Sequence, residues 1–217
     1  MQQRIVYGIV ILGLLAGGAF PAFADPFKQA VALDRQNFLA ESIPEWKQFL
    51  ETGPDKNRHI YASIKITIAY FKTGNIGEAI KAAQSLAAAY PDEFNVQFNL
   101  GNMLGATHQY TEGVQAFQKA ASLMPEEGLA RVGHGLCLFG AEQSEQSLTV
   151  LREVRKLFKQ QKNIAWYQNV RIMIGQIKGF ALYPHDFSEL WRTNNLKKIR
   201  ETYEAGVLRA LEKNLNL

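Results

Sequence analysis

The sequence predicts an all-α protein made of antiparallel helix pairs that stack one after another. Two adjacent segments of the 217-residue chain align at a spacing of 34 residues, one from Tyr61 and the other from Asn95. In each segment the apolar residues recur at the three- and four-residue spacing of a helix face, with one break near the middle. Pro91 and Pro125 close the two segments, and acidic residues follow each proline where a new helix would begin. The period therefore predicts a repeat of two helices.

Residues 1–24 have the layout of a secretory signal peptide. Arg4 is their only charge, residues 5–20 are apolar, and Ala-Phe-Ala at residues 22–24 forms a small-x-small exit. An uncleaved membrane anchor is the alternative, because the uncharged stretch approaches the roughly 20 residues that span a bilayer. Pro21 and two glycines weaken a spanning helix, so we expect cleavage before Asp25 and a periplasmic or secreted protein.

The composition is that of a globular protein, with 47% hydrophobic and 20% charged residues. Removal of Arg4 leaves 23 of the 24 basic residues against 20 acidic ones, a net charge of +3. Near the C-terminus Arg192, Lys197, Lys198 and Arg200 alternate with apolar residues on a predicted helix. This pattern is typical of a solvated helix face, and we expect no nucleic-acid partner.

The elements follow in order along the mature chain. Residues 25–58 predict a degenerate helix pair, with helices at 30–39 and 44–51, and residues 60–160 predict about three repeats. Residues 161–217 depart from the repeat and predict a helical cap, with helices at 164–177 and 195–215 separated by a turn at 183–186. The last of these helices carries one apolar face, made by Leu196, Ile199, Tyr203, Val207 and Leu211.

The second repeat resembles a tetratricopeptide repeat at seven positions: Leu100, Gly101, Leu104, Gly113, Phe117, Ala120 and Pro125. The first repeat keeps four of the family's positions, namely Tyr70, Gly74, Ala79 and Pro91. The third, from Leu129, is weaker, with His134 where Leu is usual. The resemblance implies a right-handed solenoid in which small residues such as Gly101 and Gly113 lie where helices cross.

The resemblance also implies a concave groove, lined by the first helix of each repeat, that binds an apolar peptide or helix. The groove positions carried over from the family are Tyr61, Ile64, Ile68, Phe71, Phe98, Asn102, Leu129, Val132, Leu136 and Phe139. Ile64 and Ile68 replace the polar residues of the family's carboxylate clamp, and Asn102 alone remains. Two interpretations stay open: the groove takes a segment of a partner, or the chain's own C-terminal helices fill it.

No catalytic or metal-binding pattern stands out, so we expect no enzyme activity and no cofactor. His134 and Cys137 lie three residues apart on one predicted helix, but two ligands do not make a metal site, and a buried inert thiol is expected. The leading hypothesis is a periplasmic adaptor that binds another protein during assembly of an envelope complex. The alternative is a structural subunit of such a complex, tethered to the membrane by an uncleaved residue 1–24 segment, with its groove filled by its own C-terminal helices.

Overall fold

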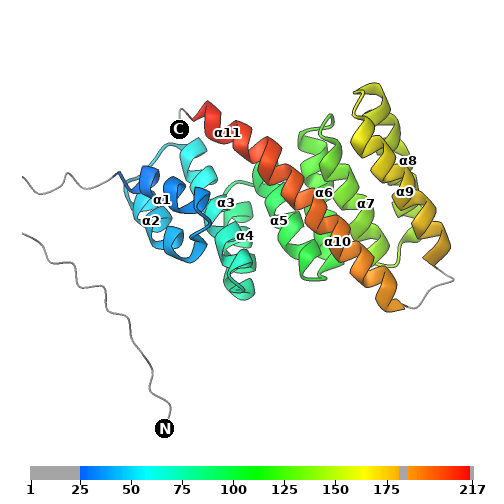
Figure 1. Cartoon of the computed structure of the whole chain (residues 1–217), viewed down its shortest axis with the longest axis horizontal. Helices are drawn as coiled ribbons and strands as arrows, with labels where there is room; N and C mark the ends of the chain where they lie inside the picture. The colour runs from blue at the N-terminus through cyan, green and yellow to red at the C-terminus, as the bar shows by residue number, and fades with distance from the viewer. Residues whose placement is uncertain (1–24, 181–184, 216–217) are drawn as a thin grey trace, which may run out of the picture.

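The computed structural model describes residues 25–180 and 185–215, and these residues are almost entirely helical. The N-terminal signal segment predicted at residues 1–24 lies outside the described residues. The helices of the repeat array follow in order: α1 (Pro26–Arg35), α2 (Leu39–Glu51), α3 (Lys56–Lys72), α4 (Ile76–Ala89), α5 (Phe94–Ala106), α6 (Tyr110–Leu123), α7 (Gly128–Gly140), α8 (Ser144–Gln160) and α9 (Ile164–Gly179). Figure 1 shows α1 to α8 as antiparallel pairs stacked into a solenoid, and α9 packs against α8 at the end of the stack.

The turn inside each pair has the same backbone geometry in all four pairs. The second residue after each first helix has a left-handed backbone, with φ of 63° at Asn37, 84° at Gly74, 63° at His108 and 62° at Glu142. The next amide donates to a carbonyl five residues earlier, as from Asn75 to Tyr70 at 2.9 Å. This bond satisfies a carbonyl that the helix end leaves free. The four turns lie 37, 34 and 34 residues apart, so they carry the sequence period into the fold.

Glycines allow the two helices of a pair to approach closely. A Cβ atom on Gly101 of α5 would lie 2.8 Å from Cγ of Phe117 in α6, and one on Gly135 of α7 would lie 2.8 Å from Cγ of Leu151 in α8. A larger side chain at either position would push the pair apart. Gly113 of α6 lies at a contact between two pairs. A Cβ atom added there would lie 3.0 Å from Cys137 Sγ in α7.

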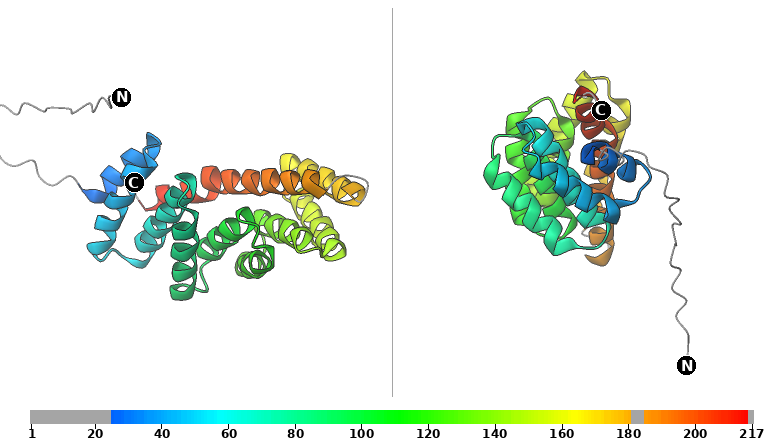
Figure 2. Two further views of the ribbon diagram at one scale, coloured as in Figure 1. Left: turned by 90° about the horizontal axis from the view of Figure 1, so that it is seen from below. Right: turned by 90° about the vertical axis from the view of Figure 1, so that its left-hand side faces the viewer.

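The C-terminal segment leaves the stack and runs back along it. It consists of α10 (His185–Tyr203), the π-helical turn η2 (Glu204–Leu208) and α11 (Arg209–Asn214). Figure 2 shows this continuous rod along one side of the arc of pairs, from the α9 end toward the first pair. Along that path α10 contacts α5 and α7. The segment therefore lies on the face formed by the first helices of the pairs.

Three helix boundaries differ from the sequence prediction. The first helix spans Pro26–Arg35 rather than 30–39, because the carboxylate of Asp25 accepts a hydrogen bond from the amide of Phe27 at its start and the left-handed Asn37 follows its end. The second helix begins at Leu39 rather than at 44, so Pro44 lies inside α2, where burial of Trp46 and neighbouring apolar side chains stabilises the helix despite one missing backbone donor. The last long helix begins at His185 rather than at 195. Trp191 in the added turns is buried against Phe180, which gives these turns an apolar anchor.

Within the described ranges, every helix is too short or too polar to cross a bilayer.

Candidate functional site

The ten residues predicted to line the groove lie on three first helices, α3, α5 and α7, and therefore share one face of the stack. Eight of them are buried: Tyr61, Ile64, Ile68, Phe98, Asn102, Leu129, Val132 and Leu136. Phe71 and Phe139 are half-buried. Binding of a partner at these ten residues stays a prediction, and it requires the C-terminal segment, which now covers this face, to leave.

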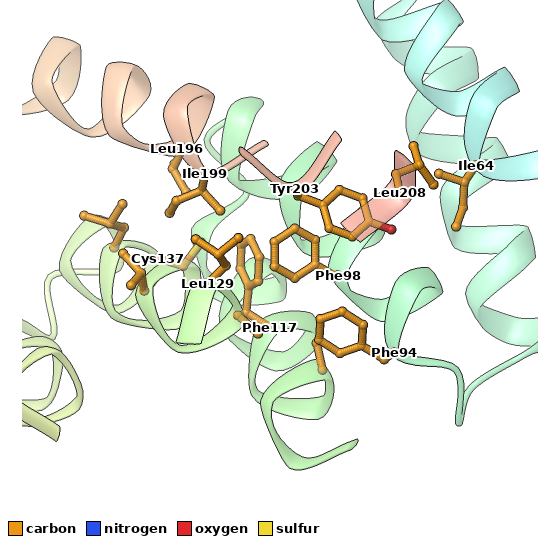
Figure 3. Close-up of a cluster of buried hydrophobic side chains, with 14 of the residues drawn as sticks. Ile64, Phe94, Phe98, Phe117, Leu129, Cys137, Leu196, Ile199, Tyr203 and Leu208 are labelled. Carbon is orange, nitrogen blue, oxygen red and sulfur yellow. The ribbon is translucent and has the colours of Figure 1, made fainter. Parts of the chain in front are cut away.

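Over α5 and α7 the covering contacts are aromatic and aliphatic. The ring of Tyr203 stacks on that of Phe98 with centroids 4.3 Å apart, and its hydroxyl donates to Asn95 Oδ1 at 3.0 Å. Figure 3 shows Leu196 and Ile199 of α10 directed at the side chains beneath them. Leu196, Ile199 and Tyr203 are all at most 2% exposed. This part of the groove is an extension of the hydrophobic core.

The far end of the groove, under η2 and α11, is held by charges instead. Lys72 Nζ lies 2.5 Å from Glu204 Oε2, and Arg35 Nη2 lies 2.6 Å from Glu212 Oε1. The hydroxyl of Tyr61 donates to the other oxygen of Glu212 at 3.0 Å. Burial, together with the charge of Glu212, raises the pKa of Tyr61. A cavity of about 420 Å³ remains between α1, α3 and this end of the segment.

Arg192 and Arg200, which were predicted to lie on a solvated helix face, lie inside the groove instead. The prediction is wrong for these two residues. Arg192 is only 6% exposed, and its guanidinium lies 5.2 Å from the ring centroids of both Tyr110 and Phe139. The guanidinium of Arg200 lies 4.6 Å from the ring centroid of Phe71, and burial lowers its pKa. A guanidinium is weakly hydrated and stacks on aromatic faces, so it can face a groove as well as water.

The one cysteine is buried, as expected, and burial raises the pKa of Cys137 to about 12. Such a thiol stays protonated near neutral pH and is a poor nucleophile. His134, one turn away, is half-buried, and burial lowers its pKa. Among the described residues, no cluster of three or more His, Cys, Asp or Glu side chains could hold a metal ion.

The strongest accumulation of charge lies on α8 and α9, outside the residues predicted to bind a partner. Residues 152–178, on α8 and α9, contain seven Lys or Arg and one acidic residue, Glu153. The net charge summed over successive stretches of the sequence would have identified this basic region. The side chains are half-buried to exposed, so the end of the stack is basic although residues 25–217 carry a net charge of only +3.

The family model of the tetratricopeptide repeat matches residues 61–93, which include most of α3, the whole of α4 and the following turn. No curated protein sequence matches the chain. Among solved structures, MamA from Desulfovibrio magneticus RS-1 is 15% identical with a TM-score of 0.59, and the match covers 82% of this chain and 94% of that one. MamA of strain AMB-1 is 19% identical with a TM-score of 0.53, over 62% of this chain and 72% of that one.

A mutant O-GlcNAc transferase of Thermobaculum terrenum is also similar, at 21% identity and a TM-score of 0.51, over 62% of this chain and 25% of that one. At such identities the similarity shows the fold alone. It confirms the predicted helix-pair solenoid, and the matched repeat identifies the kind of pair from which the solenoid is built.

Proposed function

Because the chain carries a tetratricopeptide repeat and has the fold of tetratricopeptide-repeat proteins, we propose that it is a non-catalytic scaffold that binds another protein in the cell envelope. The observation that carries this proposal is the stack of helix pairs itself, since such stacks offer extended surfaces for binding. The inert thiol of Cys137 agrees with a protein that works by binding. The signal-like residues 1–24 support export.

The filled groove decides which surface such a scaffold offers. Tyr203 and Ile199 are as buried as residues of the core, so removal of α10 would expose a large apolar surface to water. A partner is therefore more easily bound on a face that is already open. We therefore propose that a partner binds to the outer surfaces of the stack. The C-terminal segment in the groove makes the stack rigid.

The test of binding is photo-crosslinking in living cells. A photoreactive phenylalanine analogue would be placed singly at exposed positions on several faces, such as Gln118 on α6 and Gln168 on α9. We expect a crosslinked species of higher mass at positions on one face and none at the others. Absence of any ultraviolet-dependent product from every face would contradict a scaffold.

A structural subunit tethered to the membrane is the second candidate, and the filled groove is the observation that favours it. The mass of the mature protein separates the two candidates. A chain that begins at Asp25 fits the soluble scaffold, whereas a chain that retains Arg4 and sediments with membranes fits the tethered subunit. Recovery of the protein only from the cytosol would exclude both locations.

A further inference from the structure

The last helix of the repeat array, α9, has one exposed face on which no other helix of the described residues lies. Each earlier first helix packs against a second helix of its own pair, but after α9 the chain turns into the groove as α10. One side of α9 meets α10, where Lys198 donates to Asn169 and Trp191 donates to Gln176. A second side is buried toward α8 through residues such as Val170. The third side is where a second helix would lie.

The third side of α9 carries three apolar or small residues and one glutamine. It carries Ala165, Gln168, Ile172 and Gly175, which follow one another at helical spacing and are all exposed. Ile172 is 52% exposed, and a Cβ atom on Gly175 would find no atom within 4 Å. We call these four residues the second-helix slot.

The slot repeats a surface that is covered in the preceding pair. In α7 the corresponding side carries Gly128 and Gly135, and the side chains of Phe158 and Leu151 from α8 lie directly over them. The hydroxyl of Ser147 in α8 also donates to the carbonyl of Gly135 at 2.6 Å. Side chains such as Ile172 stand on the slot of α9 where α7 has glycines, so a second helix there would lie farther from α9 than α8 lies from α7, with its apolar residues beside Ile172 and over Gly175.

Basic side chains of α8 border the slot. In the preceding pair Gln118 of α6 lines the cleft that receives Gln146 and Val150 of α8. Because α8 begins 34 residues after α6, Arg152 of α8 takes the position of Gln118, beside the place of a further second helix. Arg155 follows one turn later on the same side.

The charge around the slot is strongly one-sided. Residues 152–178 carry seven basic residues and one acidic residue, and in the described part of the chain none of the seven forms an ion pair. Elsewhere several lysines and arginines do form ion pairs, as between Lys119 and Asp92. The border of the slot is therefore matched to an acidic partner.

We propose that the second-helix slot binds an acidic amphipathic helix of a partner protein, which packs against α9 as the missing second helix of the fifth pair. Its apolar stripe would cover Ile172 and Gly175, and its acidic flank would face Arg152 and Arg155. Residues 1–24 of the chain do not fit this description, because they contain no acidic residue. The inference rests on the proposed scaffold function and names the kind of partner.

The probe is a stapled synthetic helix derived from the sequence of α8, the helix that covers the corresponding side of α7. It keeps Leu151, Phe158 and the other apolar residues that face the first helix, and replaces Arg152, Arg155, Lys156 and Lys159 by glutamine. Two versions of the probe differ only at positions 145, 146, 149 and 153, which in α8 face the preceding second helix. The acidic probe carries glutamate at these four positions, and the matched control probe carries lysine. Binding to the full chain is measured by fluorescence anisotropy.

We expect saturable binding of the acidic probe and at least tenfold weaker binding of the lysine probe. The double variant Arg152→Glu, Arg155→Glu should weaken binding of the acidic probe at least tenfold, and Ile172→Gln about fivefold, since each removes one half of the proposed contact. Met124→Gln, another exposed apolar position, and the pair Lys28→Glu, Lys81→Glu serve as matched controls and should change binding less than twofold.

Three results would overturn the inference. Equal binding of the two probes, or equal loss with the control variants, would show that the contact is not at the slot. Binding of the chain to vesicles of anionic phospholipid, lost in the Arg152, Arg155 variant and unaccompanied by probe binding, would assign the surface to a membrane. Self-association abolished by Ile172→Gln, measured by sedimentation, would assign it to a second copy. The scaffold proposal would survive each of these results if photo-crosslinking still finds a partner on another face.

Discussion

The C-terminal segment is one continuous rod, yet its two halves are held in the groove by different forces. Over α5 and α7 the rod buries Leu196, Ile199 and Tyr203 in the hydrophobic core. From η2 onward, apart from the buried Leu208, it is held mainly by ion pairs and hydrogen bonds that Glu204 and Glu212 make with α1 and α3. Apolar burial is worth about 2 kcal/mol for each side chain, whereas a partly exposed ion pair is worth at most about 1 kcal/mol. We infer that the first half is a permanent part of the fold and that the second half opens first.

The largest effect is expected from Phe98→Ala. Phe98 is fully buried and its ring contacts those of Phe94, Phe117 and Tyr203, so its truncation removes contacts within the array and between the array and α10. We expect the free energy of unfolding to fall by about 3–5 kcal/mol, measured by urea denaturation. Phe71→Ala, at a half-buried groove position, should cost clearly less. Similar losses at the two positions would mean that the depth of burial does not set how much a groove residue contributes to stability.

The next effect tests the junction between the halves. Leu208 is 3% exposed, and Figure 3 shows it beside Ile64 of α3, whereas Val207 is only partly buried. Leu208→Ala should therefore reduce the free energy of unfolding by about 2–4 kcal/mol, and Val207→Ala by about 1 kcal/mol or less. Denaturation of the two variants in parallel provides the measurement. The reverse order would mean that the segment is an uninterrupted α-helix in solution.

This junction also shows how far sequence reasoning reaches. The apolar spacing of the last helix predicted a face made by Leu196, Ile199, Tyr203 and Val207, and the first three are buried together. At η2 a π-helical turn adds one residue, which moves the buried position from Val207 to Leu208. A one-residue shift of this kind depends on how the rod must pass α3. The apolar spacing of the local sequence therefore does not predict the shift from Val207 to Leu208.

The groove and the end of the stack were predictable to different degrees. The 34-residue period placed Tyr61, Phe98 and Leu129 on one face, because that face follows from local helix spacing. The occupant of the groove was left open between two interpretations, since contacts between segments more than 100 residues apart leave no local pattern. The second-helix slot was missed for the same reason: Ile172 looks like any other apolar residue of α9 until its neighbours are known.

The third prediction concerns pH and the charged half. Burial opposes ionisation of Glu212, but hydrogen bonds from Arg35 and Tyr61 outweigh it and hold the pKa of Glu212 below its usual value. The stabilisation is therefore complete above the pKa of the unfolded state, about 4.3, and is lost as the pH falls through the lower pKa of the folded state. We expect the amide signals of α11 to shift in nuclear magnetic resonance spectra below about pH 4.

The matched control for this titration is Glu212→Gln, which should remove the acid transition from α11 while leaving the signals of α5 and α7 unchanged. A transition that appears at the same pH in α5 and α7 would mean that acid unfolds the groove as a whole. The charged half would then not be an independent unit.

The smallest effect is expected from the pair of Lys72 and Glu204. The two atoms lie 2.5 Å apart, but both side chains are partly exposed, and Arg200 also approaches Glu204 at 3.7 Å. A double-mutant cycle with Lys72→Met and Glu204→Gln should give a coupling free energy of about 0.2–1 kcal/mol, measured from urea denaturation at low salt. The coupling should shrink further in 1 M salt, because salt screens exposed charges. A coupling of several kcal/mol that persists in high salt would place Lys72 and Glu204 in the same class as Phe98 and Tyr203, and the charged half would then be as firmly held as the apolar one.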